Sequence, residues 1–78
     1  MSMKAVNWAL SRRVGNGKLK ATLVAIACVC DHADSAKRQA VVREANLSDD
    51  TVLRHLKLLK FLNFLDFDRS NITLRISQ

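Results

Sequence analysis

The sequence predicts a mainly α-helical domain that closes with a small β-hairpin, an α+β fold class. Apolar residues recur every three or four positions along residues 4–62, which is the period of helices with one buried face. Over residues 64–77 the period changes to two, which is the alternation of strands. Hydrophobic residues make up 49% of the 78 positions, and the chain has no proline and two glycines. This composition is typical of one folded domain, which we expect to span residues 1–78.

The first predicted helix runs from Lys4 to Val14. Val6, Leu10 and Val14 fall at helical spacing within it, so we expect these three side chains to face the core. Glycine, asparagine and glycine follow at residues 15–17. Such a cluster breaks a helix, so the first helix should end there.

The second predicted helix covers residues 18–32. Leu19, Leu23, Ile26 and Cys30 stand at positions i, i+4, i+7 and i+11, which is the pattern of a helix with one buried face. We therefore expect this helix to be the spine of the core.

The third predicted helix covers residues 36–45, with Val41 and Val42 directed inward. Asp34 or Ser35 is the expected N-cap, because its side-chain oxygen can accept a hydrogen bond from an unpaired backbone N–H. Asn46 follows this helix. Asn adopts the left-handed conformation that ends helices more readily than most residues, so it predicts a tight joint to the next helix.

The fourth predicted helix covers about residues 48–62 and has the clearest start in the chain. Ser48 can cap its first turn by accepting a backbone hydrogen bond. Asp49 and Asp50 follow, which places negative charge where the helix dipole is positive. These three residues predict that the helix begins at this point.

The same helix divides into two faces. Val52, Leu56 and Leu59 recur at i, i+4 and i+7 and should face the core. Arg54 and Lys57 lie off that stripe. His55 stands beside the stripe and is expected to pack as a structural residue. A helix that inserts into a DNA groove needs such a division between an apolar and a basic face.

The last predicted element is an antiparallel hairpin over about residues 64–77, a wing with Arg69 at its tip. Two alternating runs flank a polar turn at residues 68–71. The apolar positions of the runs are Leu65, Phe67, Ile72, Leu74 and Ile76, and the polar positions include Asp66, Asp68, Thr73 and Arg75. We expect the apolar set to share one face of the hairpin.

Helices, a helix-turn-helix and a hairpin, in this order, are typical of a winged helix-turn-helix. The segments that carry a family resemblance are Asn7-Trp8-Ala9-Leu10, residues 20–27, Asp31-His32-Ala33-Asp34, and Leu47-Ser48 through Thr51-Val52 to Leu56. They resemble the winged-helix domain of phage and plasmid replication proteins. The pattern Leu-Ser-x-x-Thr-Val-x-x-x-Leu-x-x-Leu is also shared by many small bacterial repressors. The resemblance covers most of the chain and implies binding to DNA.

The charge balance favours the same partner. Thirteen Lys and Arg against seven Asp and Glu give a formal net charge of +6, which attracts phosphate. We expect the major groove to be met by Ser48, Asp49, Asp50, Thr51, Arg54 and Lys57, and phosphates to be held by Lys37, Arg38 and Arg69. Asp49 and Asp50 either accept from cytosine N4 or act only on the helix start.

The function expected from these observations is sequence-specific binding of double-stranded DNA as a homodimer, in a phage, plasmid or bacterial transcriptional repressor. The expected dimer contact consists of the apolar residues Trp8, Leu53, Leu58 and Phe61. Trp8 can instead cover the core. A DNA replication or plasmid segregation accessory protein is the alternative within DNA binding. A protein-interaction adaptor on the same scaffold is the alternative outside it, suggested by Asp49, Asp50 and Leu53.

Other functions are not expected. The sequence has no glycine-rich phosphate loop and no recognisable catalytic constellation, so we expect no enzyme activity, no cofactor and no small-molecule substrate. Cys28 and Cys30 lie about 200° apart around a helix, which disfavours a disulfide. Together with His32 they fall short of a four-ligand zinc site, so no metal is expected.

No membrane partner is expected either. The longest apolar run, residues 23–30, is much shorter than the roughly 20 residues that cross a bilayer. The first residues lack the order of a secretory signal. We therefore expect a cytoplasmic, nucleoid-associated protein.

Overall fold

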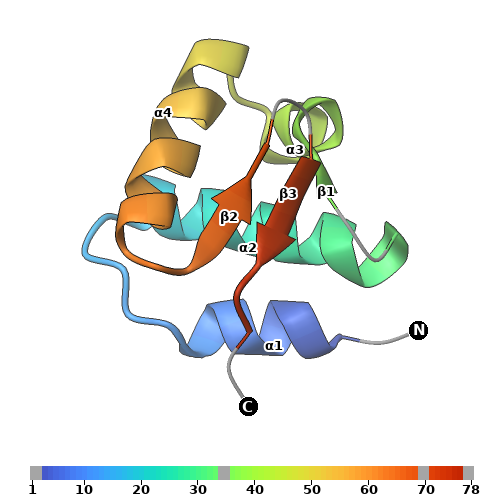
Figure 1. The fold of residues 1–78 in the computed structure, drawn as a ribbon, viewed down its shortest axis with the longest axis vertical. Helices are drawn as coiled ribbons and strands as arrows, with labels where there is room; N and C mark the ends of the chain where they lie inside the picture. Colours follow the sequence, from blue (N-terminus) through green and yellow to red (C-terminus); the bar gives the residue numbers. More distant parts are fainter. Residues whose placement is uncertain (1–2, 34–35, 69–70, 77–78) are drawn as a thin grey trace.

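The computed structural model describes residues 3–33, 36–68 and 71–76. These residues form α1 (Lys4–Ser11), α2 (Gly17–Ala33), β1 (Ala36–Lys37), α3 (Arg38–Ala45), α4 (Asp49–Phe61), β2 (Leu65–Phe67) and β3 (Asn71–Leu74) (Figure 1). The strands make one antiparallel sheet in the order β1-β3-β2. The expected mainly α-helical fold with a small antiparallel hairpin is confirmed.

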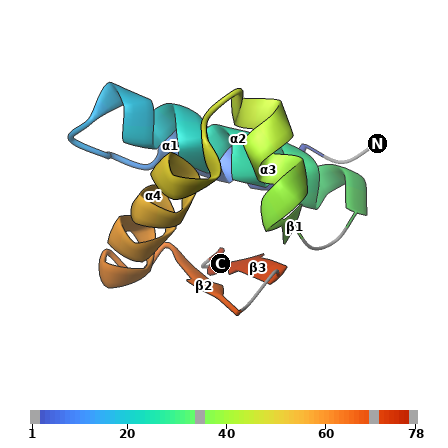
Figure 2. The same ribbon diagram turned by 90° about the horizontal axis from the view of Figure 1, so that it is seen from above.

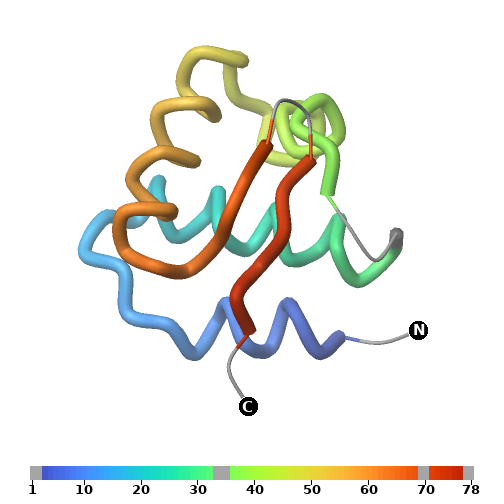
Figure 3. Tube along the Cα trace, in the orientation of Figure 1, coloured from blue at the N-terminus to red at the C-terminus, as the bar shows by residue number. Residues whose placement is uncertain are grey.

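The helix α2 lies at the centre of the packing, as its periodicity predicts. The sheet lies on one side of α2 and α4 flanks both, as the view from above shows (Figure 2). In the chain trace, β2 and β3 run side by side across α2, and α1 lies beyond it (Figure 3). The largest fully buried side chains come from α2, α3, α4, β2 and β3 and are Thr22, Leu23, Ile26, Val41, Val52, Leu56, Leu59, Leu65 and Ile72.

The first helix differs from the prediction in both its end and its buried face. It stops at Ser11, and its C-cap Arg12 is extended, with φ −82° and ψ 138°. Leu10 is 57% exposed, whereas Ala5, Trp8 and Ala9 are buried. The predicted stripe is therefore wrong at Leu10, whereas Val6 and Val14 are partly buried and pack against the core. Trp8 and the two alanines fill the fully buried face of the helix.

Residues of α2 hold both ends of α1, which gives the early end a physical cause. The Asp31 carboxylate accepts hydrogen bonds from the backbone N–H groups of Ala5 (2.9 Å) and Val6 (3.0 Å). At the other end, Lys20 Nζ donates to the carbonyl oxygens of Leu10 and Arg12. Each charge opposes the partial charge of the helix terminus that it meets.

The third helix begins two residues later than predicted, at Arg38. Ala36 and Lys37 form β1 instead, because they pair with Ile72 and Asn71 of β3. The N-cap is Lys37, which makes no side-chain capping bond. The expected caps, residues 34 and 35, lie outside the described residues. A pairing between segments 35 residues apart leaves no trace in local periodicity.

The hairpin agrees with the alternation in the sequence. Leu65 pairs with Leu74 and Phe67 with Ile72, and Leu65 and Ile72 are buried. The apolar positions thus face the helices, as predicted. Within the described ranges, no helix combines the length and the apolar content that a membrane crossing requires.

Candidate nucleic-acid interface

A short joint fixes the direction in which α4 leaves α3. Asn46 is left-handed, with φ 56° and ψ 43°, and Leu47 N–H donates to the Val42 carbonyl at 3.3 Å. The Ser48 hydroxyl then accepts from Thr51 N–H at 3.2 Å and contacts the Thr51 hydroxyl at 2.8 Å. Both sequence predictions, the Asn46 turn and the Ser48 cap, are confirmed. Thr51 is half-buried and engaged with the cap.

The two faces of α4 are separated as the spacing predicts. Val52, Leu56 and Leu59 are completely buried. Arg54 and Lys57 are exposed, and a separation of three residues puts them on neighbouring parts of the outward face. The outer surface of α4 therefore carries a pair of cations above a helix that the core holds rigidly.

At the start of α4 one expected phosphate contact is occupied. Arg38 Nε lies 3.1 Å from Asp49 Oδ1, and the two side chains are 33% and 56% exposed. This ion pair joins the first turn of α3 to the first turn of α4. Asp50, next to it in α4, is exposed. In the free protein Arg38 is thus ion-paired with Asp49, which sequence spacing does not reveal.

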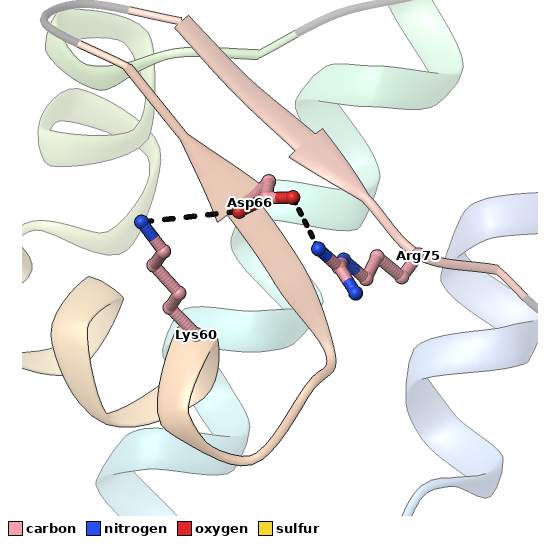
Figure 4. Close-up of polar contacts among 3 residues, drawn as sticks. All are labelled: Lys60, Asp66 and Arg75. Atoms are coloured by element: carbon pink, nitrogen blue, oxygen red, sulfur yellow. Dashed lines mark hydrogen bonds and ion pairs between the residues drawn. The ribbon is translucent and has the colours of Figure 1, made fainter.

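A second acidic residue neutralises cations at the hairpin (Figure 4). Asp66 of β2 lies 2.5 Å from Arg75 Nη2 and 3.9 Å from Lys60 Nζ of α4. The hydrogen bond from Arg75, and then the charges of Arg75 and Lys60, lower the pKa of Asp66. Lys60 Nζ also lies 5.4 Å from the centre of the Phe67 ring. These contacts tie the end of α4 to the hairpin.

Other cations take no part in these ion pairs. In residues 3–33, 36–68 and 71–76, side chains without an ion-pair partner include those of Arg13, Lys18, Lys37, Arg43, Arg54 and Lys57. Lys37, Arg54 and Lys57 were expected at the interface from the sequence. Lys18 was not, because nothing in its local sequence relates it to α4. Arg69, the expected wing contact, lies outside the described residues.

An apolar patch occupies the end of α4. Leu58, Phe61 and Leu62 are 48%, 84% and 46% exposed. Leu58 and Phe61 were expected to be available to a partner, and Leu62 was missed although it stands at i+4 from Leu58. We call these three residues the α4 patch.

The other two residues of the expected dimer contact lie elsewhere. Leu53 is half-buried. Trp8 is only 8% exposed and meets Phe64 edge-on at 6.1 Å between ring centres. Trp8 therefore covers the core, one of the two places expected for it, and has little surface left for a partner.

His55 links α4 to α2. Its Nδ1 lies 2.7 Å from Thr22 Oγ1, and the Thr22 hydroxyl lies 3.1 Å from the Lys18 carbonyl oxygen. The Thr22 hydroxyl thus connects the first turn of α2 to the ring of His55 in α4. Burial of the ring, followed by the charges of Arg54 and Lys18, lowers the pKa of His55. The residue packs as a structural side chain, as the sequence suggested.

Acidification is expected to destabilise the fold through His55. In the unfolded chain His55 takes up a proton near its ordinary pKa of about 6.5, whereas the folded chain resists protonation. The stabilisation is therefore complete above about pH 6.5 and is lost as the pH falls through the lower folded-state pKa. Urea unfolding followed by the fluorescence of Trp8, the single Trp of the chain, measures it. His55→Gln should flatten this pH dependence.

The cysteines form no recognisable metal site. Cys28 and Cys30 are free and half-buried, and the described residues contain no group of three or more His, Cys, Asp or Glu side chains that could hold an ion. Burial, and then the neighbouring Asp31, raise the pKa of the Cys30 thiol. This environment disfavours the thiolate, which is the form that binds metals.

Comparison with protein-family models, with curated proteins and with solved structures finds no match to this chain. The functional assignment therefore depends on the geometry and charges of the chain itself.

Proposed function

We propose that this protein binds double-stranded DNA, with α3 and α4 as a helix-turn-helix, α4 as its recognition helix and the β2–β3 hairpin as its wing. The observation that carries the proposal is the outward face of α4. Arg54 and Lys57 are exposed there and have no acidic partner among the described residues, opposite a face whose apolar residues are fully buried. A rigid helix with free cations on its outer side fits the major groove, which is about 12 Å wide.

The expected contacts differ along α4. Arg54 can present two parallel N–H donors to O6 and N7 of a guanine, whereas Lys57 supplies a point charge suited to phosphate. At the N-terminus of α4 the Ser48 and Thr51 hydroxyls are hydrogen-bonded to each other, which stabilises the turn that would enter the groove. Lys37 precedes α3 and is exposed, a position suited to contact the adjacent DNA phosphates. Arg69, which lies outside the described residues, remains an expected phosphate contact.

The biological role that we propose is sequence-specific transcriptional repression. A replication or segregation accessory protein uses the same contacts, so the position of the DNA site in its genome distinguishes these roles. The α4 patch, an exposed apolar surface beside the basic one, favours the protein-interaction adaptor as the second candidate.

Titration of a labelled duplex at several salt concentrations tests the proposal. Binding through phosphates releases counterions, so log K should fall linearly with log salt, with a slope of about −0.9 per neutralised phosphate. Selection from random duplexes should enrich one sequence. Absence of salt-dependent duplex binding would refute the proposal and favour the adaptor.

We also propose that the protein binds its site as a homodimer through the α4 patch. Removing exposed apolar surface from water stabilises such a contact. A two-fold dimer places its recognition helices in successive major grooves, so the selected sequence should be an inverted repeat with half-sites about 10 base pairs apart. Light scattering should give a dimeric mass on this site, and Phe61→Ser should reduce it to a monomeric one. A monomeric wild-type complex contradicts the dimer.

Asp49→Asn is expected to strengthen DNA binding. The substitution removes a negative charge from the N-terminus of α4 and releases Arg38 from its 3.1 Å ion pair. If Arg38 then meets a phosphate, log K should fall more steeply with log salt, by about 0.9 in slope. Asp50→Asn is the matched control, because it removes the same charge without releasing an ion-paired Arg. Equal slopes for the two variants would show that Arg38 does not reach DNA.

A further inference from the structure

The crossing of α2 and α4 places a second basic element beside the proposed recognition helix. Thr22 is completely buried, and its hydroxyl bridges the Lys18 carbonyl (3.1 Å) and His55 Nδ1 (2.7 Å). The first turn of α2 is therefore fixed against the middle of α4. Lys18 and Arg54, 36 positions apart in the chain, both neighbour this bridge.

Lys18 and Arg54 both lie near enough to His55 for their charges to act on its ring. Lys18 and Arg54 are exposed, whereas His55 is buried. Each of the two charges opposes protonation of the His55 ring, which lowers its pKa after the larger effect of burial. In the described part of the chain, neither cation has an acidic partner. Both positive charges therefore act on the His55 ring, and the charge of the pair is left for an external anion.

Two backbone N–H groups in the first turn of α2 already have a hydrogen-bond acceptor. Asn16 Oδ1 accepts from the N–H groups of Lys18 (2.9 Å) and Leu19 (3.3 Å). These two amides are therefore not available to an arriving anion, which can instead meet the Lys18 ammonium. This makes the side chain the group that a substitution can test.

We propose that Lys18 contacts a DNA backbone phosphate beside the groove that α4 enters, so that the binding face extends from α4 to the first turn of α2. The inference rests on the proposed function, because it takes double-stranded DNA as the ligand. It adds a contact from a helix outside the α3–α4 unit. Arg54 reads the base edge, and Lys18 holds the strand that borders it.

Lys18→Gln, Lys18→Arg and Arg43→Gln test the proposal in duplex titrations over several salt concentrations. Lys18→Gln should weaken binding several-fold on the selected duplex and equally on a random one, and should lower the salt slope by about 0.9. Lys18→Arg should restore both. Arg43→Gln removes the same charge from an exposed position in the last turn of α3 and should leave the slope nearly unchanged. Thermal unfolding checks that each variant is folded.

The outcomes separate this inference from the proposed function. If the wild-type protein shows no salt-dependent duplex binding, both are refuted. If it binds and Lys18→Gln has the wild-type slope, only the contact from Lys18 is refuted. An NMR titration of His55 in the free protein tests the geometry without DNA: Lys18→Gln should raise its pKa, and an unchanged pKa contradicts the proximity on which the inference depends.

Discussion

Arg54→Ala is expected to weaken binding to the selected duplex by about 1–3 kcal/mol, roughly 5- to 150-fold, and to weaken binding to a random duplex much less. Arg54 is exposed on the outer face of α4 and has no acidic partner among the described residues. Its guanidinium is therefore free to form two hydrogen bonds to a guanine. Losing them removes discrimination between sequences, because a random duplex offers the guanine only by chance.

Arg54→Lys is the matched control for this prediction. Lysine keeps the positive charge but lacks the planar pair of donors. It should therefore preserve the salt slope and the affinity for random DNA while losing most of the preference for the selected sequence. Fluorescence anisotropy with both duplexes measures these quantities. Equal losses on both duplexes for Arg54→Ala would assign Arg54 to the phosphate backbone.

Asp31→Ala is expected to lower the free energy of unfolding by about 2 kcal/mol, because two hydrogen bonds from backbone amides to a charged acceptor are lost. The N-cap of α1, Met3, makes no side-chain capping bond, and the first turn of α1 has no acidic residue. The Asp31 carboxylate is thus the acceptor for the backbone N–H groups of Ala5 and Val6. In a domain of this size such a loss corresponds to about 8–16 °C in Tm.

Trp8 fluorescence follows this change directly, since Trp8 lies in α1. Asp31→Asn keeps one carbonyl acceptor, so its free energy of unfolding should fall between those of the wild-type protein and Asp31→Ala. Asp50→Ala is the comparison at the start of another helix, where Ser48 already provides the cap. Asp50→Ala should lower the free energy of unfolding by about 0.3–1 kcal/mol, the usual effect of one charge on a helix dipole. Equal losses for Asp31→Ala and Asp50→Ala would show that Asp31 does not cap α1.

The sequence alone determined the features that depend on near neighbours. Ser48 caps the residues directly after it, and Asn46 ends the helix that it follows, so both are local chemistry. The periods of α2, α4 and the β2–β3 hairpin predict their buried faces, because each is long or regular enough to show its period. The exposed cations of α4 follow from the same periodicity.

Only the tertiary structure decided the features that depend on contacts between residues far apart in the sequence. The two residues of β1 form a strand because they pair with β3, which is far from them in the sequence. Trp8 of α1 is buried because α1 packs on α2 and the Trp8 ring contacts Phe64. Which cations stay free depends on pairs such as Arg38 with Asp49 and Lys60 with Asp66. Lys18 lies near α4 because the Thr22 hydroxyl contacts both the Lys18 carbonyl and His55 across the two helices. Periodicity records which face of an element is buried, and only the fold determines what that face meets.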